Sequence, residues 1–296
     1  MRFPSLARTA RGLLPLLLLP ISLGALAAEI ATDPGDYKPL PPGATIGILY
    51  LQHAERDAYY GAAARLPGRF RLQTDIGLAR IVHYTKAGNY VFNPQVILPF
   101  GRVELKTPLG PLGPVSASGT GDPIVGGTLW VLNEEARSLG LSAFVSMPLG
   151  RYEGNRGPLN VGENRWKGIF QAGYVVGLSK NWTLDLVGET ALYGDNKDFL
   201  GLRREQSASY GVQAHVRYSL SQASSVAVSY LQDFGGETRL AGVHQDDRMN
   251  NRRWEIGYAT FVAPTLQLMV EVGKGGKTVN GARESSRFNL RLVQVF

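Results

Sequence analysis

The sequence SRFNLRLVQVF occupies residues 286–296 at the end of the chain. Successive side chains of a β-strand point to opposite sides, so alternate residues share a face. The alternation here predicts a strand with one apolar and one polar face that runs to the last residue. The apolar positions are Phe288, Leu290, Leu292 and Phe296, and the polar positions are Arg287, Asn289 and Arg291.

This strand resembles the C-terminal signal strand of bacterial outer-membrane β-barrels. In those proteins an aromatic last residue and alternating apolar positions are recognised during assembly. Phe296 supplies the aromatic residue, and Gln294 interrupts the apolar row. The resemblance implies that the barrel-assembly machinery is a partner that recognises this strand.

The start of the chain has the pattern of a secretory signal peptide. Three arginines, Arg2, Arg8 and Arg11, precede an apolar stretch at 13–23 and small residues at 25–27. The apolar stretch is shorter than the about 20 residues that span a bilayer as a helix. We therefore expect residues 1–27 to be cleaved off after Ala27. Cleavage removes three positive charges from a formal +7, so the basic balance gives little reason to expect a nucleic-acid partner.

The composition excludes several classes of protein. The chain has no cysteine, which rules out disulfides and thiolate metal sites, and it has 36 glycines. After the signal peptide, no apolar run approaches the length of a transmembrane helix. Only helices and closed barrels satisfy every backbone group in lipid, so a membrane protein without such helices would have to be a barrel. The classes that remain are a soluble periplasmic β-protein and an outer-membrane barrel.

The spacing of the predicted strands favours the barrel. Their number is even, and short and long connections alternate, as in outer-membrane barrels with short periplasmic turns and long outer loops. We predict an all-β fold, a transmembrane antiparallel up-and-down barrel over residues 43–296. Strand 286–296 should close it by pairing with strands 265–273 and 43–52. The twelve strands are 43–52, 70–83, 90–105, 123–132, 139–148, 166–178, 182–193, 207–220, 225–234, 252–262, 265–273 and 286–296.

Polar positions that alternate with the apolar rows are expected to line the lumen. Apart from one histidine, the candidates are six basic and six acidic residues. A pore for polyanions would carry an excess of one sign. The balance leaves two interpretations, a ladder of ion pairs that fixes the barrel or a narrow channel for small, weakly charged solutes. The candidates are Arg71, Asp75, Lys167, Asp185, Glu189, His215, Arg217, Asp233, Arg253, Glu255, Glu271, Arg287 and Arg291.

The four tryptophans lie near predicted strand ends, where an amphipathic ring suits the lipid headgroup level; they are Trp130, Trp166, Trp182 and Trp254.

We predict no catalytic, cofactor-binding or metal-binding residues. The glycines of 119–122 are not followed by the Lys-Ser/Thr of a phosphate-binding loop. His215 is expected to be a hydrogen-bonding group of the lumen rather than a catalytic base. We expect Asp246 and Asp247 to be a solvated pair of charges in an outer loop; weak calcium binding is the alternative.

Two segments are candidates for a plug in the lumen. Residues 28–42 are rich in proline and are expected to be a disordered periplasmic segment, with entry into the lumen as the alternative. Residues 106–122 carry no charge between Lys106 and Asp122, which suits either an inward fold or an exposed loop.

Several motifs resemble the family of outer-membrane transporters named after the MetA-pathway of phenol degradation. The resemblance covers residues 43–296, and Leu149 stands where the family typically has threonine. It implies an outer-membrane barrel and uptake of aromatic or other hydrophobic small molecules, and it supplies no substrate-contacting residues. The motifs are GTGDP at 119–123, MPLGRY at 147–152, NVGENRW at 160–166, and YGDN at 193–196 with Asp198.

We therefore expect a channel or facilitator for passive uptake of small, hydrophobic or aromatic solutes, with outer-membrane lipid around it. The alternative is a structural or adhesive barrel that binds a partner through its long outer loops, including residues 235–251. A barrel enzyme ranks third, because no nucleophile, base and orienting acid are grouped in the sequence.

Overall fold

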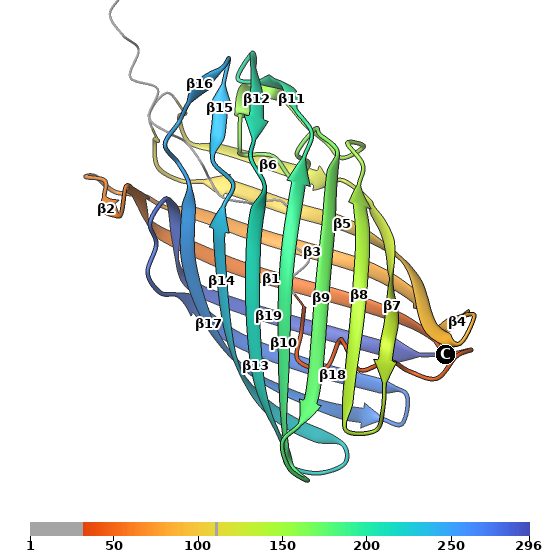
Figure 1. Cartoon of the computed structure of the whole chain (residues 1–296). Coiled ribbons are helices and arrows are strands. Elements are labelled where there is room, and N and C mark those ends of the chain that lie inside the picture. Colours follow the sequence, from red (N-terminus) through yellow and green to blue (C-terminus); the bar gives the residue numbers. More distant parts are fainter. Residues whose placement is uncertain (1–31, 110–111) are drawn as a thin grey trace, which may run out of the picture.

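The computed structural model describes residues 32–109 and 112–296, so the predicted signal peptide lies outside the described residues. Twelve antiparallel strands form a closed ring, as the sequence predicts (Figure 1). The ring consists of β1 (Thr45–Gly61), β3 (Leu72–His83), β5 (Tyr90–Leu105), β7 (Ile124–Asn133), β8 (Arg137–Ser146), β9 (Lys167–Gly177), β10 (Trp182–Tyr193), β13 (Ser209–Ser219), β14 (Ser224–Gly235), β17 (Met249–Ala263), β18 (Leu266–Gly275) and β19 (Gly281–Val295).

The last strand closes the ring with the partners that the sequence predicts. Leu290 of β19 pairs with Leu51 of β1 on one side and with Val270 of β18 on the other. Lipid cannot satisfy the backbone groups of an open sheet edge, and this closure leaves no such edge between β1 and β19. β19 begins five residues earlier than predicted, and Arg283 in this extension forms an ion pair of 2.8 Å with Asp57 of β1.

The two ends of the barrel differ in the length of their connections. Turns of a few residues join β7 to β8, β9 to β10, β13 to β14 and β17 to β18. The opposite end carries longer connections with structure of their own, several of which gather at the top of Figure 1. We call the short-turn end periplasmic and the other end outer, following outer-membrane barrels. The additional elements are β2 (Ala64–Arg65), β4 (Thr85–Ala87), β6 (Val115–Thr120), the 3₁₀-helix η1 (Gly154–Arg156), β11 (Asn196–Phe199), β12 (Leu202–Gln206), β15 (Thr238–Leu240) and β16 (Val243–His244), of which β4 belongs to the periplasmic end.

Three of the four tryptophans lie on the outside of the wall. Trp166, Trp182 and Trp254 are each about half exposed, and the ring of Trp254 contacts Tyr230 at 4.7 Å between centroids. Trp130 is only 2% exposed, and its Nε1 donates a hydrogen bond to the Tyr37 carbonyl oxygen. The expectation of a headgroup position is therefore wrong for Trp130, which faces the lumen.

The wall changes its strand pairing at the outer end of β5. β5 pairs with β7 near the periplasm and with β6 further out, and it changes partner between Ile97 and Phe100. Within the described residues β6 pairs with no strand besides β5. Its other edge is joined to the following loop by a bond of 2.8 Å from the Arg151 amide to the Thr120 carbonyl. We call this contact between β6 and residues 147–151 the seam.

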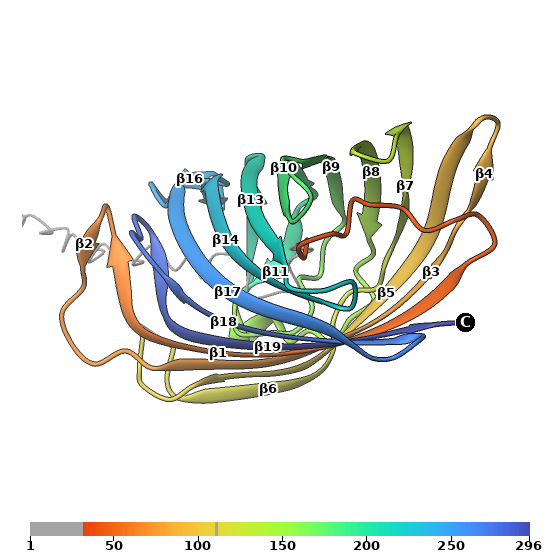
Figure 2. The ribbon, with the colours of Figure 1, turned by 90° about the horizontal axis from the view of Figure 1, so that it is seen from below.

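Residues 32–42, which we call the plug, lie inside the ring (Figure 2). The expectation of disorder is wrong for these residues, because side chains of the wall hold them from several directions. The second plug candidate, as far as it is described, forms β6 and a short bridge between Leu109 and Leu112. Both leucines are buried in one cluster with inner-face residues such as Leu72 and Leu105, so these two side chains point inward, whereas β6 itself lies in the wall beside β5.

Candidate functional site: the barrel lumen

Most of the predicted lumen residues lie on the inner face of the wall. The alternation is clear in β13, where Val212 is 41% exposed on the outside while Gln213 and His215 are at most 8% exposed on the inside. The same alternation places the other candidates on neighbouring strands. Those that face inward are Lys167, Asp185, Glu189, His215, Arg217, Asp233, Arg253, Glu255, Glu271, Arg287 and Arg291.

Arg71 and Asp75 lie on the outer face instead, which corrects the sequence-based assignment. The Asp75 side chain is 48% exposed and lies 2.6 Å from His53 Nδ1, whereas Leu72 and Ile76 between them are buried on the inside. The reason is that β3 reverses the usual rule here, with an apolar inner face and a polar outer face. Outward charges indicate that this part of the wall rises beyond the hydrocarbon layer.

The inner faces of β1, β3 and β5, which we call the apolar half of the lumen, carry many apolar side chains together with the polar Arg80, Asn93 and Gln95. Their apolar side chains pack with residues of two outer loops, among them Leu109, Leu112 and Leu159. The strands from β9 to β19 supply the polar half. The apolar side chains of the three strands include Ile46, Ile48, Ile76, Leu78, Val82, Ile97, Val103 and Leu105.

The plug is held by hydrogen bonds to five strands of the wall. Thr32 donates from its hydroxyl to Gln213 Oε1 at 2.9 Å, and the Gly35 amide donates to Asp185 Oδ2 at 2.6 Å. The Tyr37 hydroxyl bonds Ser142 and Gln171, and its carbonyl oxygen accepts bonds from Trp130 and Ser138. Polar groups of β7, β8, β9, β10 and β13 thus converge on these few residues.

Two buried carboxylates fix the plug to β19. Arg291 lies 2.8 Å from Asp36 and 3.2 Å from Asp33, and Arg80 of β3 faces Asp36 at 3.6 Å. Burial alone would raise the pKa of Asp36, but Arg291 and Arg80 outweigh it and hold that pKa below its usual value. For Asp33 burial prevails over Arg291, so its pKa lies well above the usual value. The two arginines thus favour the anionic form of Asp36, whereas burial disfavours the anionic form of Asp33.

Sequence reasoning missed Arg80 and the plug carboxylates. Arg80 shares the inner face of β3 with Leu78 and Val82, so its strand reads as apolar on that side. It donates a bond of 3.2 Å to the Tyr50 hydroxyl. A lone arginine within an apolar row is a signal that could have identified this position, because an isolated buried charge needs a partner.

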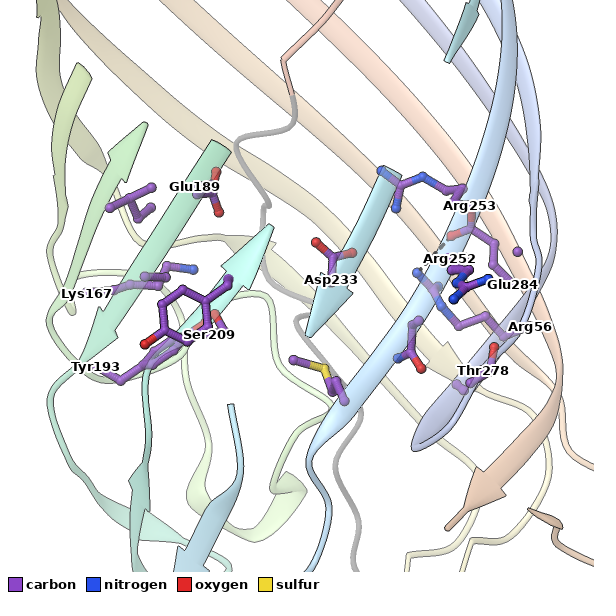
Figure 3. A pocket seen from close by; sticks show the side chains of 17 residues that line it. Arg56, Lys167, Glu189, Tyr193, Ser209, Asp233, Arg252, Arg253, Thr278 and Glu284 are labelled. Carbon is purple, nitrogen blue, oxygen red and sulfur yellow. Dashed lines mark hydrogen bonds and ion pairs between the residues drawn. The ribbon is translucent and has the colours of Figure 1, made fainter. Parts of the chain in front are cut away.

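A cavity of about 120 Å³ lies in the outer half of the lumen (Figure 3). Lys167 and Glu189 line one side, Arg56 and Glu284 line the other, and Asp233 lies between them. Close ion pairs fix its walls, for example Arg56 with Glu284 at 3.2 Å. A second cavity of about 220 Å³ surrounds the plug. Further ion pairs at the outer cavity join Lys167 to Glu163, Arg253 to Glu255, and Arg287 to Glu284.

The motifs that carry the family resemblance meet at the seam. Asp122 accepts hydrogen bonds from the Gly150 amide at 2.9 Å and the Glu163 amide at 2.7 Å. Asn196 donates to the Glu163 carbonyl at 2.9 Å. A Cβ on Gly150 would lie 2.5 Å from the Gly121 carbonyl carbon, so only glycine fits this close approach. The motifs are structural: they join three loops beside β6.

Two of the candidate ligand residues of the sequence analysis, His215 and Asp247, have hydrogen-bond partners within the wall and the loops. Within them, no three His, Asp or Glu side chains converge as metal ligands. His215 Nδ1 lies 2.8 Å from Ser229 Oγ, deep in the polar wall where both residues are 1% exposed. Asp247 is buried and accepts bonds from the Thr238 amide and hydroxyl, so it is not a solvated charge. The described part of the chain also contains no helix long and apolar enough to span a bilayer.

Comparisons with known proteins agree with this architecture. A family model described as "Putative MetA-pathway of phenol degradation" matches residues 56–292. The crystal structure of the COG4313 outer membrane channel from Pseudomonas putida F1 is 38% identical, with a TM-score of 0.85 over 90% of this chain and 100% of that chain. A search of curated proteins finds no match.

Two autotransporter barrels share the fold alone. The β-domain of the Bordetella autotransporter BrkA is 9% identical, with a TM-score of 0.54 over 86% of this chain and 100% of that chain. The transport unit of AIDA-I from Escherichia coli is 8% identical, with a TM-score of 0.51 over 90% and 92% of the two chains. On the family match and the related channel, this chain is an outer-membrane β-barrel and belongs to the MetA-pathway of phenol degradation family.

Proposed function

We propose that the protein is an outer-membrane channel for passive uptake of small hydrophobic or aromatic compounds. The apolar half of the lumen carries this proposal, because a pore for ions or sugars has no need of an inner wall of Ile, Leu and Val side chains. The family's description names phenol degradation, and the 38% identical relative is described as a channel. The description as a channel supports a transporter rather than an enzyme, and the family's description supports an aromatic solute.

The route of the solute follows from the plug and the seam. The plug crosses the periplasmic half of the lumen, so a solute that enters from outside meets Tyr37 and the Arg291 ion pairs. The seam is a weaker place in the wall, where one edge of β6 lacks a strand partner within the described residues. A hydrophobic solute would leave the apolar half sideways at Thr120, which pairs with the outward-facing, exposed Phe100, because its transfer into lipid is favourable.

A reversible lock across the seam tests this route. The chain has no cysteine, so Thr120→Cys and Arg151→Cys introduce the only thiols, and a short crosslinker joins them. The readout is entry of a fluorescent hydrophobic amine into vesicles with a lipopolysaccharide outer leaflet. We expect the protein to accelerate entry, the crosslink to remove the acceleration, and the uncrosslinked double variant to keep it. Equal entry with and without protein would contradict the channel, whereas equal entry with and without the crosslink would contradict only the sideways route.

The export and assembly signals complete the proposal. We propose that the signal peptide is cleaved after Ala27 and that the barrel-assembly machinery recognises the strand that ends in Phe296. Phe296 is 79% exposed beside the paired β19, which leaves its ring accessible to a partner. Outer-membrane lipid then surrounds the exposed apolar rows of the wall.

The outer loops support a second candidate function, binding of a surface partner. β11, β12, β15 and β16 form a four-stranded sheet from two separate loops, and Val243 at its end is 65% exposed. Such a sheet offers an edge for another chain. Deletion of residues 236–247 separates the two functions, because a channel keeps solute entry and an adhesive barrel loses its partner.

A further inference from the structure

A small cavity lies beside the outer cavity, among the loops of the outer end. It has a volume of about 40 Å³, and Arg165 and Arg204 line it. Tyr193 and Met249 line both cavities, so the two are neighbours. Lys167, which pairs with Tyr193 across β9 and β10, lies on the same side of the outer cavity (Figure 3). Cationic side chains thus gather where the two cavities meet.

Arg165 is buried with one of its nitrogens unused. The residue is 5% exposed, and its Nε donates to Glu163 Oε2 at 2.8 Å. Its Nη1 is also buried and has no hydrogen-bond partner among the described residues. The guanidinium carbon lies 4.3 Å from the centre of the Tyr193 ring, and such stacking occupies the face of the group but not its N–H edge. A buried donor without a partner costs free energy, so this nitrogen favours a bound acceptor.

Arg204 carries a positive charge without a direct counter-charge. Within the part of the chain that the structure describes, no carboxylate forms an ion pair with it. Its Nη2 donates to Gln206 Oε1 at 3.3 Å, and its guanidinium carbon lies 4.8 Å from the centre of the Phe199 ring. Burial and, after it, the nearby Arg165 lower the pKa of Arg204 to about 10. Two cations near each other favour an anion between them.

The acids near Arg204 already have partners. Glu163 accepts from Lys167 through Oε1 at 2.7 Å and from Arg165 through Oε2. Asp247 accepts bonds from the Thr238 amide and hydroxyl. Among the described residues that line the two cavities, six are arginine or lysine and four are glutamate or aspartate. An anionic ligand would offset this excess of positive charge.

The outer cavity offers an apolar surface next to these cations. Ala191 pairs with Ile169 in the row of side chains that continues to Tyr193 and Lys167, and both are at most 4% exposed. Met249, between the two cavities, has an unbranched side chain that adapts to a ligand. A water-sized group needs about 10–15 Å³. The cavities of about 120 and 40 Å³ are therefore large enough for one aromatic ring and for one carboxylate, respectively.

We propose that the outer end of the lumen binds small aromatic carboxylates, with the carboxylate between Arg165 and Arg204 and the ring in the outer cavity. This inference rests on the proposed function, because it names a class of solute for the same lumen. It does not use the sideways route, since a charged carboxylate does not enter lipid readily. Such an acid would leave past the plug instead.

Calorimetric titration of the folded, mature protein tests the site with three probes. Benzoate has both the ring and the charge, benzyl alcohol has the ring alone, and acetate has the charge alone. We expect benzoate to bind at least about tenfold more tightly than either of the others, because it gains charged hydrogen bonds and ring burial together. Benzoate that binds no more tightly than benzyl alcohol would overturn the anion site. Benzoate that binds no more tightly than acetate would overturn the placement of the ring.

Variants of two neighbouring arginines separate the site from a general effect of charge. Arg204→Gln should weaken benzoate binding by about tenfold or more and leave benzyl alcohol binding unchanged. Arg203→Gln, next in the chain, removes the same charge from exposed pairs with Asp195 and Glu205 and should leave both unchanged. Arg204→Lys keeps the charge and should bind benzoate more tightly than Arg204→Gln does. An equal loss of benzoate binding in Arg204→Gln and Arg203→Gln would overturn the proposal.

Entry of the fluorescent amine into vesicles distinguishes this inference from the proposed function. The Arg204→Gln variant should keep that entry, because the site binds an anion. A wild type that admits the amine but does not bind benzoate would overturn the aromatic carboxylate site alone. A wild type that binds benzoate but admits no amine would contradict the channel while the site stands.

Discussion

At the scale of single residues, Arg291 makes the contacts on which the plug depends most. It faces both Asp33 and Asp36, and its removal leaves buried carboxylates without their main partner. Arg291→Gln should weaken plug docking by about 3 kcal/mol, roughly 100-fold, since Arg80 still faces Asp36. Single-channel recording should show frequent openings in this variant. The control is Arg283→Gln on the same strand, which removes an exposed ion pair with Asp57; the channel of this variant should stay closed. Equally frequent openings in the Arg291→Gln and Arg283→Gln channels would contradict the role of Arg291.

The two plug carboxylates predict opposite responses to pH. The pKa of Asp33 is raised in the folded state, so its contribution to docking is full below its unfolded pKa and is lost as pH rises through the folded pKa. The pKa of Asp36 is lowered, so its contribution is present above the unfolded pKa, about 4, and is lost as pH falls below it. Between pH 7 and about 4, acidification should therefore tighten the plug.

Isosteric variants measure these two contributions separately. Asp36→Asn should raise the open probability at pH 7. Asp33→Asn should leave it equal or lower and should remove the tightening between pH 7 and about 4. The measurement is single-channel conductance recorded between pH 7 and about 4. An Asp33→Asn channel that opens more often than an Asp36→Asn channel would contradict the opposite pKa shifts of the two carboxyl groups.

At the scale of elements, Asp122 joins the loops beside β6. It accepts two amide bonds, from Gly150 and Glu163, and bonds to a charged acceptor are among the stronger ones. Asp122→Ala should loosen these loops by about 2 kcal/mol without unfolding the ring of strands. Hydrogen exchange should become faster around these amides while the protein still migrates as a folded barrel. Exchange unchanged from wild type, or equally fast in an Asp195→Asn control, would contradict this role.

The strands show why sequence patterns succeed in some elements and fail in others. In β13, β14 and β17 the outer face touches lipid, so the apolar row on the outside and the polar row on the inside were predictable. At the outer end of β3 the apolar row faces the lumen and the polar row faces outward, because Leu72 and Ile76 pack inside while Arg71 and Asp75 lie outside. Periodicity shows that two faces differ but not which one meets lipid.

The plug could not be predicted for a different reason. Residues 32–42 have a proline-rich sequence typical of disorder, and their order comes from partners far away in the chain. Thr32 bonds Gln213, and Asp36 pairs with Arg291, across separations of 181 and 255 residues. The polar lumen row was predictable, but the segment that it binds was not, because register and shear decide which inward side chains converge.

At the scale of the whole molecule, the closing strand has separate roles in assembly and in stability. β19 joins β18 and β1 through its backbone, whereas the Phe296 side chain is 79% exposed. Deletion of Phe296 should therefore lower the amount of barrel in the outer membrane of cells several-fold, while barrels refolded in detergent keep their thermal stability. Equal amounts in cells would contradict recognition of Phe296, and a large loss of stability in detergent would assign it a packing role instead.

The central claim is that this barrel is a channel whose straight path is closed by residues 32–42. The most direct test compares single-channel conductance of the mature protein with that of a variant that lacks residues 28–42, after heat-modifiable migration shows that both are folded. We predict that the mature protein conducts little and opens rarely, and that the variant forms a steadily conducting pore. A folded variant that remains as closed as the mature protein would contradict the claim.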